Sequence, residues 1–103
     1  CPVVFPSGVG VVGWMVPGGR DIAVATSELM KKYDVAIWAH HGMFCSGETF
    51  DSTFGLMHTV EKAADIYVRA LSCGQGIRQE ISDDGIRAIA RDFKVDLRED
   101  FLD

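Results

Sequence analysis

The segment from residue 49 to residue 73 constrains the fold most, because it is the longest stretch with a single periodicity. Thr49 is a good N-cap residue before it, and Gly74 is a typical residue for a helix to end at. Apolar side chains recur at the three- and four-residue spacing of one helix face: Phe54, Met57, Val60, Ala64, Tyr67 and Leu71. We therefore predict a long amphipathic helix that buries this face against another layer.

The shorter segments alternate between strand and helix patterns. In chain order, with the long helix included, the predicted elements are strand, helix, strand, strand, helix and helix, over residues 1–6, 20–33, 35–40, 43–47, 49–73 and 82–94. The tail 96–103 is polar and is expected to fray unless its apolar residues dock on a neighbour. This order predicts an α/β fold in which helices cover a small β-sheet.

The stretch from residue 7 to residue 19 is rich in glycine, and we predict a compact loop there. Gly8, Gly10 and Gly13 match the spacing of the dinucleotide-binding fingerprint. However, the residues that follow, among them Pro17, do not open a helix, and the fingerprint requires one. Dinucleotide binding is therefore not predicted.

Length and charge narrow the function classes. A chain of 103 residues is one domain at most. Its net charge of −5 argues against binding to nucleic acid or to an anionic membrane surface, since both need basic patches. No apolar run approaches the ~20 residues of a membrane span. The three cysteines form no CxxC motif, so we expect a soluble protein of a reducing cytoplasm.

The segment IWAHHGMFCSG contains the strongest candidate site, because His40 and His41 stand where an apolar strand gives way to a loop. Successive strand side chains point to opposite faces, so at most one of the two is a metal ligand. A catalytic zinc site needs three protein ligands, and His58 is the only other histidine. A Cys45–His41 nucleophile pair lacks an orienting third group. The residues alone therefore indicate an incomplete metal site.

Three runs carry a family resemblance: VVFPSGVGVVGWMVPGG, VAIWAHHGMFCSG and TFGLMHTVEKAA. In this order and spacing they resemble the C-terminal part of members of the class II aldolase/adducin family. The likeness spans nearly the whole chain and weakens after about residue 95. It implies a three-layer α/β/α fold, with residues 1–103 as the C-terminal portion of a single domain whose N-terminal portion is absent from this sequence. The WMVPG loop distinguishes the chain from the fuculose-phosphate aldolase and ribulose-phosphate epimerase branches.

The resemblance also implies an activity. It implies a zinc-dependent lyase that cleaves L-rhamnulose 1-phosphate to dihydroxyacetone phosphate and L-lactaldehyde, with zinc acting as a Lewis acid. The family's third histidine ligand falls at the His-Gly step, which makes His41 the metal ligand here. His40 departs from the family pattern and is the alternative ligand.

The partners follow from the same resemblance. It implies a homotetramer, and it places the other ligands, the catalytic glutamate and the phosphate-binding residues in the absent N-terminal portion. We therefore expect the 103-residue chain to be inactive by itself. The alternatives are a non-catalytic interaction domain of the adducin type and a related sugar-phosphate epimerase.

Overall fold

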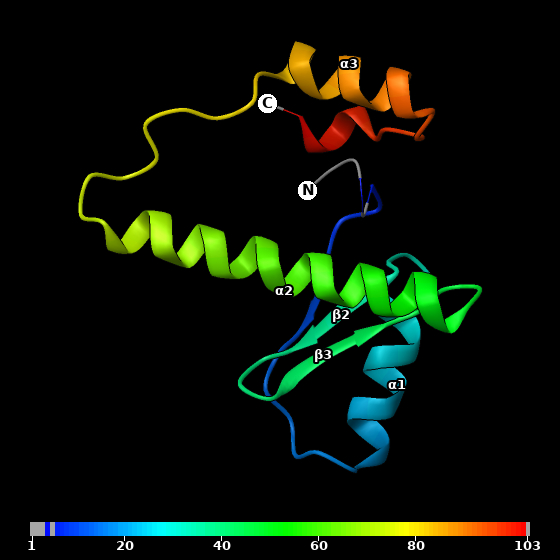
Figure 1. Cartoon of the computed structure of the whole chain (residues 1–103). Helices are drawn as coiled ribbons and strands as arrows, with labels where there is room; N and C mark the ends of the chain where they lie inside the picture. The colour runs from blue at the N-terminus through cyan, green and yellow to red at the C-terminus, as the bar shows by residue number, and fades with distance from the viewer. Residues whose placement is uncertain (1–3, 5, 103) are drawn as a thin grey trace.

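The computed structural model describes residue 4 and residues 6–102 of the chain (Figure 1). Its elements in chain order are β1 (Gly10–Val12), α1 (Arg20–Leu29), β2 (Val35–Trp38), β3 (Gly42–Cys45), α2 (Phe50–Ser72), α3 (Asp83–Phe93) and a short 3-10 helix, η1 (Glu99–Phe101). Among these described helices, none has the length and apolar character needed to cross a membrane.

The three strands form one mixed sheet in the order β1-β2-β3. Strands β1 and β2 are parallel, with Val12 opposite Trp38, because α1 carries the chain back across the sheet between them. Strands β2 and β3 are an antiparallel hairpin with Val35 opposite Cys45. The carboxyl ends of β1 and β2 therefore lie at the same end of the sheet as the hairpin turn.

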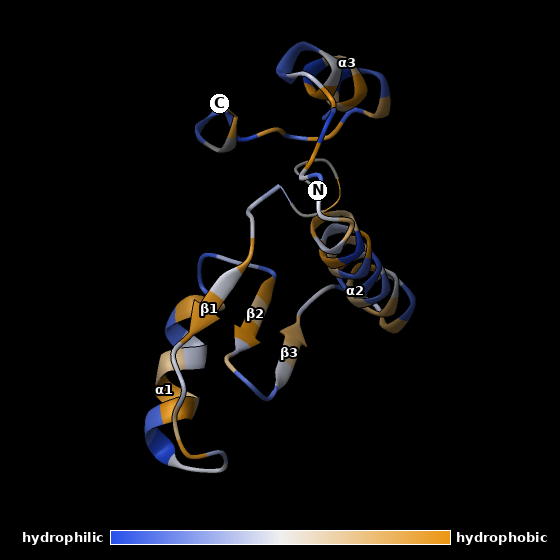
Figure 2. Cartoon of the chain, turned by 90° about the vertical axis from the view of Figure 1, so that its left-hand side faces the viewer, coloured by the Kyte–Doolittle hydropathy of each residue, from blue (hydrophilic) through white to orange (hydrophobic). Residues whose placement is uncertain are grey.

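The alternation of side chains along β2 divides its residues between two helical layers. Val35 points to the face covered by α2, where it forms the buried core with Val60. Trp38 points to the opposite face, where it contacts Thr26 of α1. Figure 2 shows α1 and α2 on opposite sides of the sheet. The predicted α/β/α layering is confirmed.

Strand β1 was not predicted, because it lies inside the glycine-rich stretch that we expected to be a loop. Gly10 fits this position because a Cβ there would lie only 2.8 Å from the Tyr33 ring, so glycine lets the strand approach the end of α1. Val12 is buried beside it. The strand predicted over residues 1–6 falls mainly outside the described residues, and Val4 and Pro6, which are described, lie in turns.

Helix α2 confirms the predicted long helix, and Thr49 caps it by accepting a hydrogen bond from the Ser52 backbone N–H. The predicted buried stripe is wrong at most of its positions. Val60 is buried and Met57 is half-buried, whereas the other four are exposed: Phe54 by 71%, Tyr67 by 56%, Leu71 by 48%, and Ala64. The length of the helix explains the exposure of Tyr67 and Leu71, but not that of Phe54 near its start. A 23-residue helix extends about 35 Å, whereas strands of four residues reach only about 13 Å. The sheet therefore does not reach the second half of α2.

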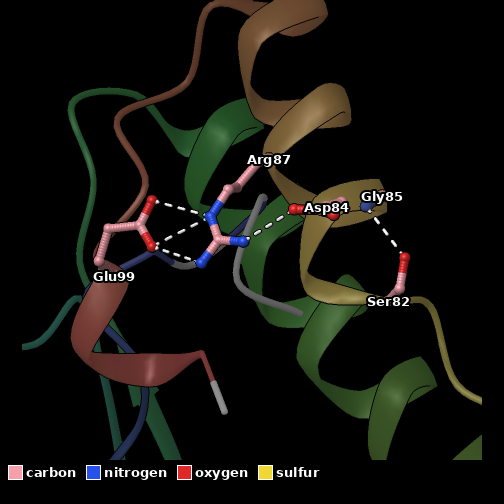
Figure 3. Close-up of polar contacts among 5 residues, drawn as sticks. All are labelled: Ser82, Asp84, Gly85, Arg87 and Glu99. Carbon is pink, nitrogen blue, oxygen red and sulfur yellow. Dashed lines mark hydrogen bonds and ion pairs between the residues drawn. The ribbon is translucent and has the colours of Figure 1, made fainter.

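The C-terminal arm, defined as residues 73–102, forms a separate small assembly above α2 (Figure 1). Helix α3 begins at Ser82, whose side chain accepts a hydrogen bond from the Gly85 N–H. Arg87 of α3 reaches across to Glu99 of η1 and also pairs with Asp84 (Figure 3). The tail is therefore ordered against α3.

The remaining elements match their predictions within a few residues. Helix α1 begins at Arg20 as predicted but ends at Leu29, four residues before the predicted end. Strand β2 ends at Trp38, two residues before its predicted end, because residues 39–41 form the turn that joins it to β3. Strand β3 begins at Gly42, one residue earlier than predicted, and ends at Cys45, two residues earlier. This turn places the candidate histidines.

Candidate functional site

The candidate site lies at the carboxyl end of the parallel strands. The Ala39 N–H donates a hydrogen bond of 3.0 Å to the Val12 carbonyl, so the turn 39–41 is tied to the end of β1. The glycine-rich loop 13–19 leaves the sheet at the same point. In open α/β sheets, ligands bind outside the carboxyl ends of the strands. The turn that contains both histidines is therefore in the position where this architecture places ligand sites.

The backbone of the turn is held in a specific shape. The His41 N–H donates a hydrogen bond of 3.0 Å to the Trp38 carbonyl and closes the turn. His40 occupies the third turn position with a φ of 62°, in the left-handed region. A residue with a side chain rarely adopts this conformation, although histidine does so more often than most. Such conformations concentrate at functional sites.

The His41 side chain is exposed and stands beside an aromatic ring. Its imidazole centroid lies 5.3 Å from that of Trp38, with the ring planes inclined at 38°. Within the described part of the chain, neither His41 ring nitrogen has a hydrogen-bond partner. Both nitrogens are therefore accessible from solvent.

Trp38 is itself anchored from α1. Its indole N–H donates a hydrogen bond of 2.8 Å to the Thr26 hydroxyl, and its ring packs 4.4 Å from that of Phe44. The sequence indicated no role for Trp38 or Thr26 beyond strand and helix packing. The available signal was the alternation along β2, which places Trp38 on the α1 side of the sheet.

The other sequence candidates lie elsewhere. Cys45 is opposite Val35, at the end of the hairpin away from the turn, so it is not beside His41. Burial also raises the pKa of the Cys45 thiol, which disfavours the reactive thiolate. His58 is exposed on α2, with its ring 6.3 Å from that of Phe54. A nucleophilic Cys45–His41 pair is therefore excluded.

The histidines of the turn are the candidate metal ligands, and a metal site needs further ligands close to them. Among the described residues, no three His, Cys, Asp or Glu side chains come together as a set of metal ligands. A catalytic zinc needs three. An exposed imidazole with both nitrogens unpartnered does fit one position of such a set. His41 thus fits a zinc site whose other ligands come from outside the described chain, and His40, also exposed, stands beside it.

A comparison of the sequence with models of known protein families gives a match. The family model described as "Class II Aldolase and Adducin N-terminal domain" matches residues 1–68, about two thirds of the chain. The chain belongs to the class II aldolase and adducin family. The family resemblance inferred from the three sequence runs is therefore confirmed.

Several curated members of this family are similar over almost the whole chain. The rhamnulose-1-phosphate aldolase of Listeria innocua serovar 6a is 46% identical over 102 residues, which cover 99% of this chain and 37% of that protein. The protein of the same name from Klebsiella pneumoniae subsp. pneumoniae is 47% identical over 103 residues, with 100% and 37% covered. That of Escherichia coli O139:H28 is 46% identical over 95 residues, with 92% and 34% covered.

The chain spans about 37% of the length of the Listeria innocua and Klebsiella pneumoniae relatives. The described residues of this family member provide a mixed sheet with a helix on each face and one histidine-bearing turn at the end of the parallel strands. They do not provide a complete set of metal ligands.

Proposed function

We propose that residues 1–103 are the C-terminal portion of a single class II aldolase domain, and that the whole protein cleaves L-rhamnulose 1-phosphate to dihydroxyacetone phosphate and L-lactaldehyde. The observation that carries this proposal is the 46% identity over 99% of the chain to a rhamnulose-1-phosphate aldolase. The exposed His41 turn at the carboxyl ends of β1 and β2 supports it.

Within this proposal His41 is one zinc ligand. A bound zinc would supply Lewis-acid stabilisation of the negative charge that develops on the substrate oxygens. The chain's own contribution is to hold an imidazole donor in place, which it does through the turn closed by the His41 N–H. One imidazole does not hold a catalytic zinc, because such sites use three protein ligands. The 103-residue chain is therefore proposed to be inactive by itself.

The proposal includes the assembly and the compartment. Large apolar side chains remain exposed on α2, with Phe50 96% and Phe54 71% exposed, and contacts between subunits of a homotetramer would cover such surfaces. Cys45 and Cys73 are both free thiols, which suits a reducing cytoplasm. Sugar-phosphate chemistry also belongs to that compartment in this proposal.

The test uses the whole parent protein, purified with its metal. Incubation with L-rhamnulose 1-phosphate should release dihydroxyacetone phosphate, detected by its enzymatic reduction with NADH, and L-lactaldehyde, detected by chromatography. A chelator should abolish the reaction and added zinc should restore it. His41→Ala should lose at least ~100-fold in activity, whereas His58→Ala, the matched control on α2, should retain it.

Three results would contradict the proposal. An epimerised ketose phosphate in place of two smaller products would indicate the epimerase alternative. A parent protein that binds no zinc and cleaves no sugar phosphate would indicate the non-catalytic adducin type. Full activity of His41→Ala together with loss of activity in His40→Ala would move the ligand to the neighbouring histidine.

A further inference from the structure

We infer that Thr26 and Trp38 are positioning residues for His41: a hydroxyl on α1 fixes the indole, and the indole in turn fixes the imidazole. This inference rests on the proposed role of His41 as a zinc ligand. It extends that role from one exposed side chain to a defined path of contacts that runs into the helical layer.

The first step is the hydrogen-bond inventory of Thr26. Its hydroxyl has one proton, which it donates to the Ile22 carbonyl over 2.6 Å. Its oxygen is therefore left to accept, and the Trp38 indole N–H donates to it over 2.8 Å. Because the indole N–H can only donate, the two hydrogen bonds are compatible in one direction alone. Both side chains are partly buried, so water competes weakly for these groups.

The second step is the position of the indole. Trp38 packs against Phe44 on one side, with 4.4 Å between the ring centroids, and against His41, with 5.3 Å between centroids. Tilted rings at these separations attract each other beyond the effect of buried area. With its N–H fixed by Thr26 and one side occupied by Phe44, the indole presents a fixed surface to the imidazole.

The third step is that Trp38 holds His41 at two points. The Trp38 carbonyl accepts the hydrogen bond from the His41 N–H, which fixes the backbone of the turn. The Trp38 ring contacts the imidazole, which has no other ring contact or hydrogen bond among the residues that the structure describes. An exposed imidazole would otherwise rotate freely about two side-chain torsions. Its preorganisation for a metal therefore depends on this one neighbour.

Groups that orient a metal ligand usually affect metal affinity strongly: their loss costs about 10–100-fold. We call the contacts from Thr26 through Trp38 to His41 the relay. The substitution that tests it is Thr26→Val, which keeps the shape of the side chain and removes the hydroxyl that accepts the indole hydrogen bond. Thr26→Ser keeps the hydroxyl and should rescue. Ser27→Ala is the matched control, because Ser27 on the same helix donates to the Ala23 carbonyl in the same way but accepts no hydrogen bond from the indole.

The experiment measures the zinc dissociation constant of the whole parent protein by competition with a chromophoric chelator. Thr26→Val and Trp38→Phe should each weaken zinc binding about tenfold, while Thr26→Ser and Ser27→Ala stay within about twofold of the unchanged protein. In the metal-free protein, NMR should show the His41 ring more mobile in Thr26→Val than in Ser27→Ala. This second measurement does not depend on catalysis.

The outcomes separate the relay from the proposed function. Unchanged zinc affinity in Thr26→Val, even with a lowered thermal midpoint, would overturn the relay and leave Thr26 a packing residue. Unchanged zinc affinity in His41→Ala would instead overturn the proposed metal role. Equal losses in Thr26→Val and Ser27→Ala would assign the effect to α1 as a whole and would also overturn the relay.

Discussion

The sheet unit, defined as β1–β3 with α1 and α2, and the C-terminal arm are stabilised by different interactions. Almost all of the buried side chains among the described residues belong to the sheet unit, and Val35 and Ala36 are 0% exposed. Among the arm residues whose burial the structure describes, Ala90 alone is buried, and an exposed ion pair, Arg87–Glu99, joins α3 to η1. Apolar burial contributes about 25 cal/mol per Å², whereas exposed ion pairs contribute little. The sheet unit should therefore be the stable part.

This difference bears on function, because the part of the candidate site that the described residues provide lies in the sheet unit. The turn 39–41 is fixed by one backbone hydrogen bond to Val12 of β1, by one to Trp38 of β2 and by the aromatic contact to the Trp38 ring. The arm adds no group to it among the described contacts. Local opening of the arm should therefore leave the site intact.

The largest expected effect comes from the core of the sheet unit. Val35→Ala should lower the free energy of unfolding by about 2–3 kcal/mol, because it removes two buried methyl groups and leaves a cavity. Val68→Ala is the matched control: it makes the same change at an exposed position of α2. Urea denaturation followed by circular dichroism measures both. Equal effects would show that Val35 is not at the centre of stability.

Removal of the two helix caps tests the comparison directly. Thr49→Ala and Ser82→Ala each remove a side-chain acceptor at a helix N-terminus, which costs about 1 kcal/mol. The first should lower the stability of the whole sheet unit. The second should raise hydrogen exchange only within α3. Hydrogen exchange followed by mass spectrometry separates them, and faster exchange in β2 of Ser82→Ala would show that the two regions unfold together.

A smaller effect is expected at the strained turn. His40→Gly should change stability by less than about 1 kcal/mol, since relief of the left-handed φ offsets the extra entropy of glycine in the unfolded chain. The thermal midpoint measures this, with His58→Gly on α2 as the helical control, where glycine should destabilise. A loss above about 2 kcal/mol in His40→Gly would show that the His40 side chain stabilises the turn.

The smallest effect concerns pH and the arm. The hydrogen bonds from Arg87 lower the pKa of Glu99 below its ordinary value of 4.5, so the ionised carboxylate favours the folded arm. Its contribution is complete above pH 4.5 and is lost as the pH falls through the lowered folded value. NMR titration of the Glu99 carboxyl group should give a midpoint below 4.5, and in Arg87→Gln the midpoint should return to the ordinary value. An ordinary midpoint in the unchanged protein would exclude the pairing.

Part of the fold could be predicted from local patterns. The two capped helices were predicted almost to the residue, because Thr49 and Ser82 mark their starts and their apolar residues repeat at helical spacing. Strand β1 was missed because glycine normally signals a turn, and only the approach of Tyr33 shows why Gly10 belongs in a strand. The extent of burial on α2 was also missed, because it depends on the length of the strands beneath it.

The candidate site divides in the same way. The histidine turn is visible in the sequence as two polar residues that end an apolar run. The path of contacts from Thr26 through Trp38 to His41 is not visible in the sequence, because Thr26 and Trp38 are twelve positions apart in the chain. The indole finds its partner only in the folded protein, where α1 connects β1 to the parallel strand β2 and brings Thr26 beside Trp38.

The sequence by itself determined which segments are helices, where they are capped, which turn carries the histidines and to which family the chain belongs, because these depend on neighbouring residues and on order. Tertiary structure alone decided that Gly10 lies in a strand, that half of α2 lacks a partner and that His41 rests on an anchored indole. The physical reason is that burial and side-chain contact depend on which residues a neighbouring layer of secondary structure covers. The local sequence pattern does not specify how far that layer extends.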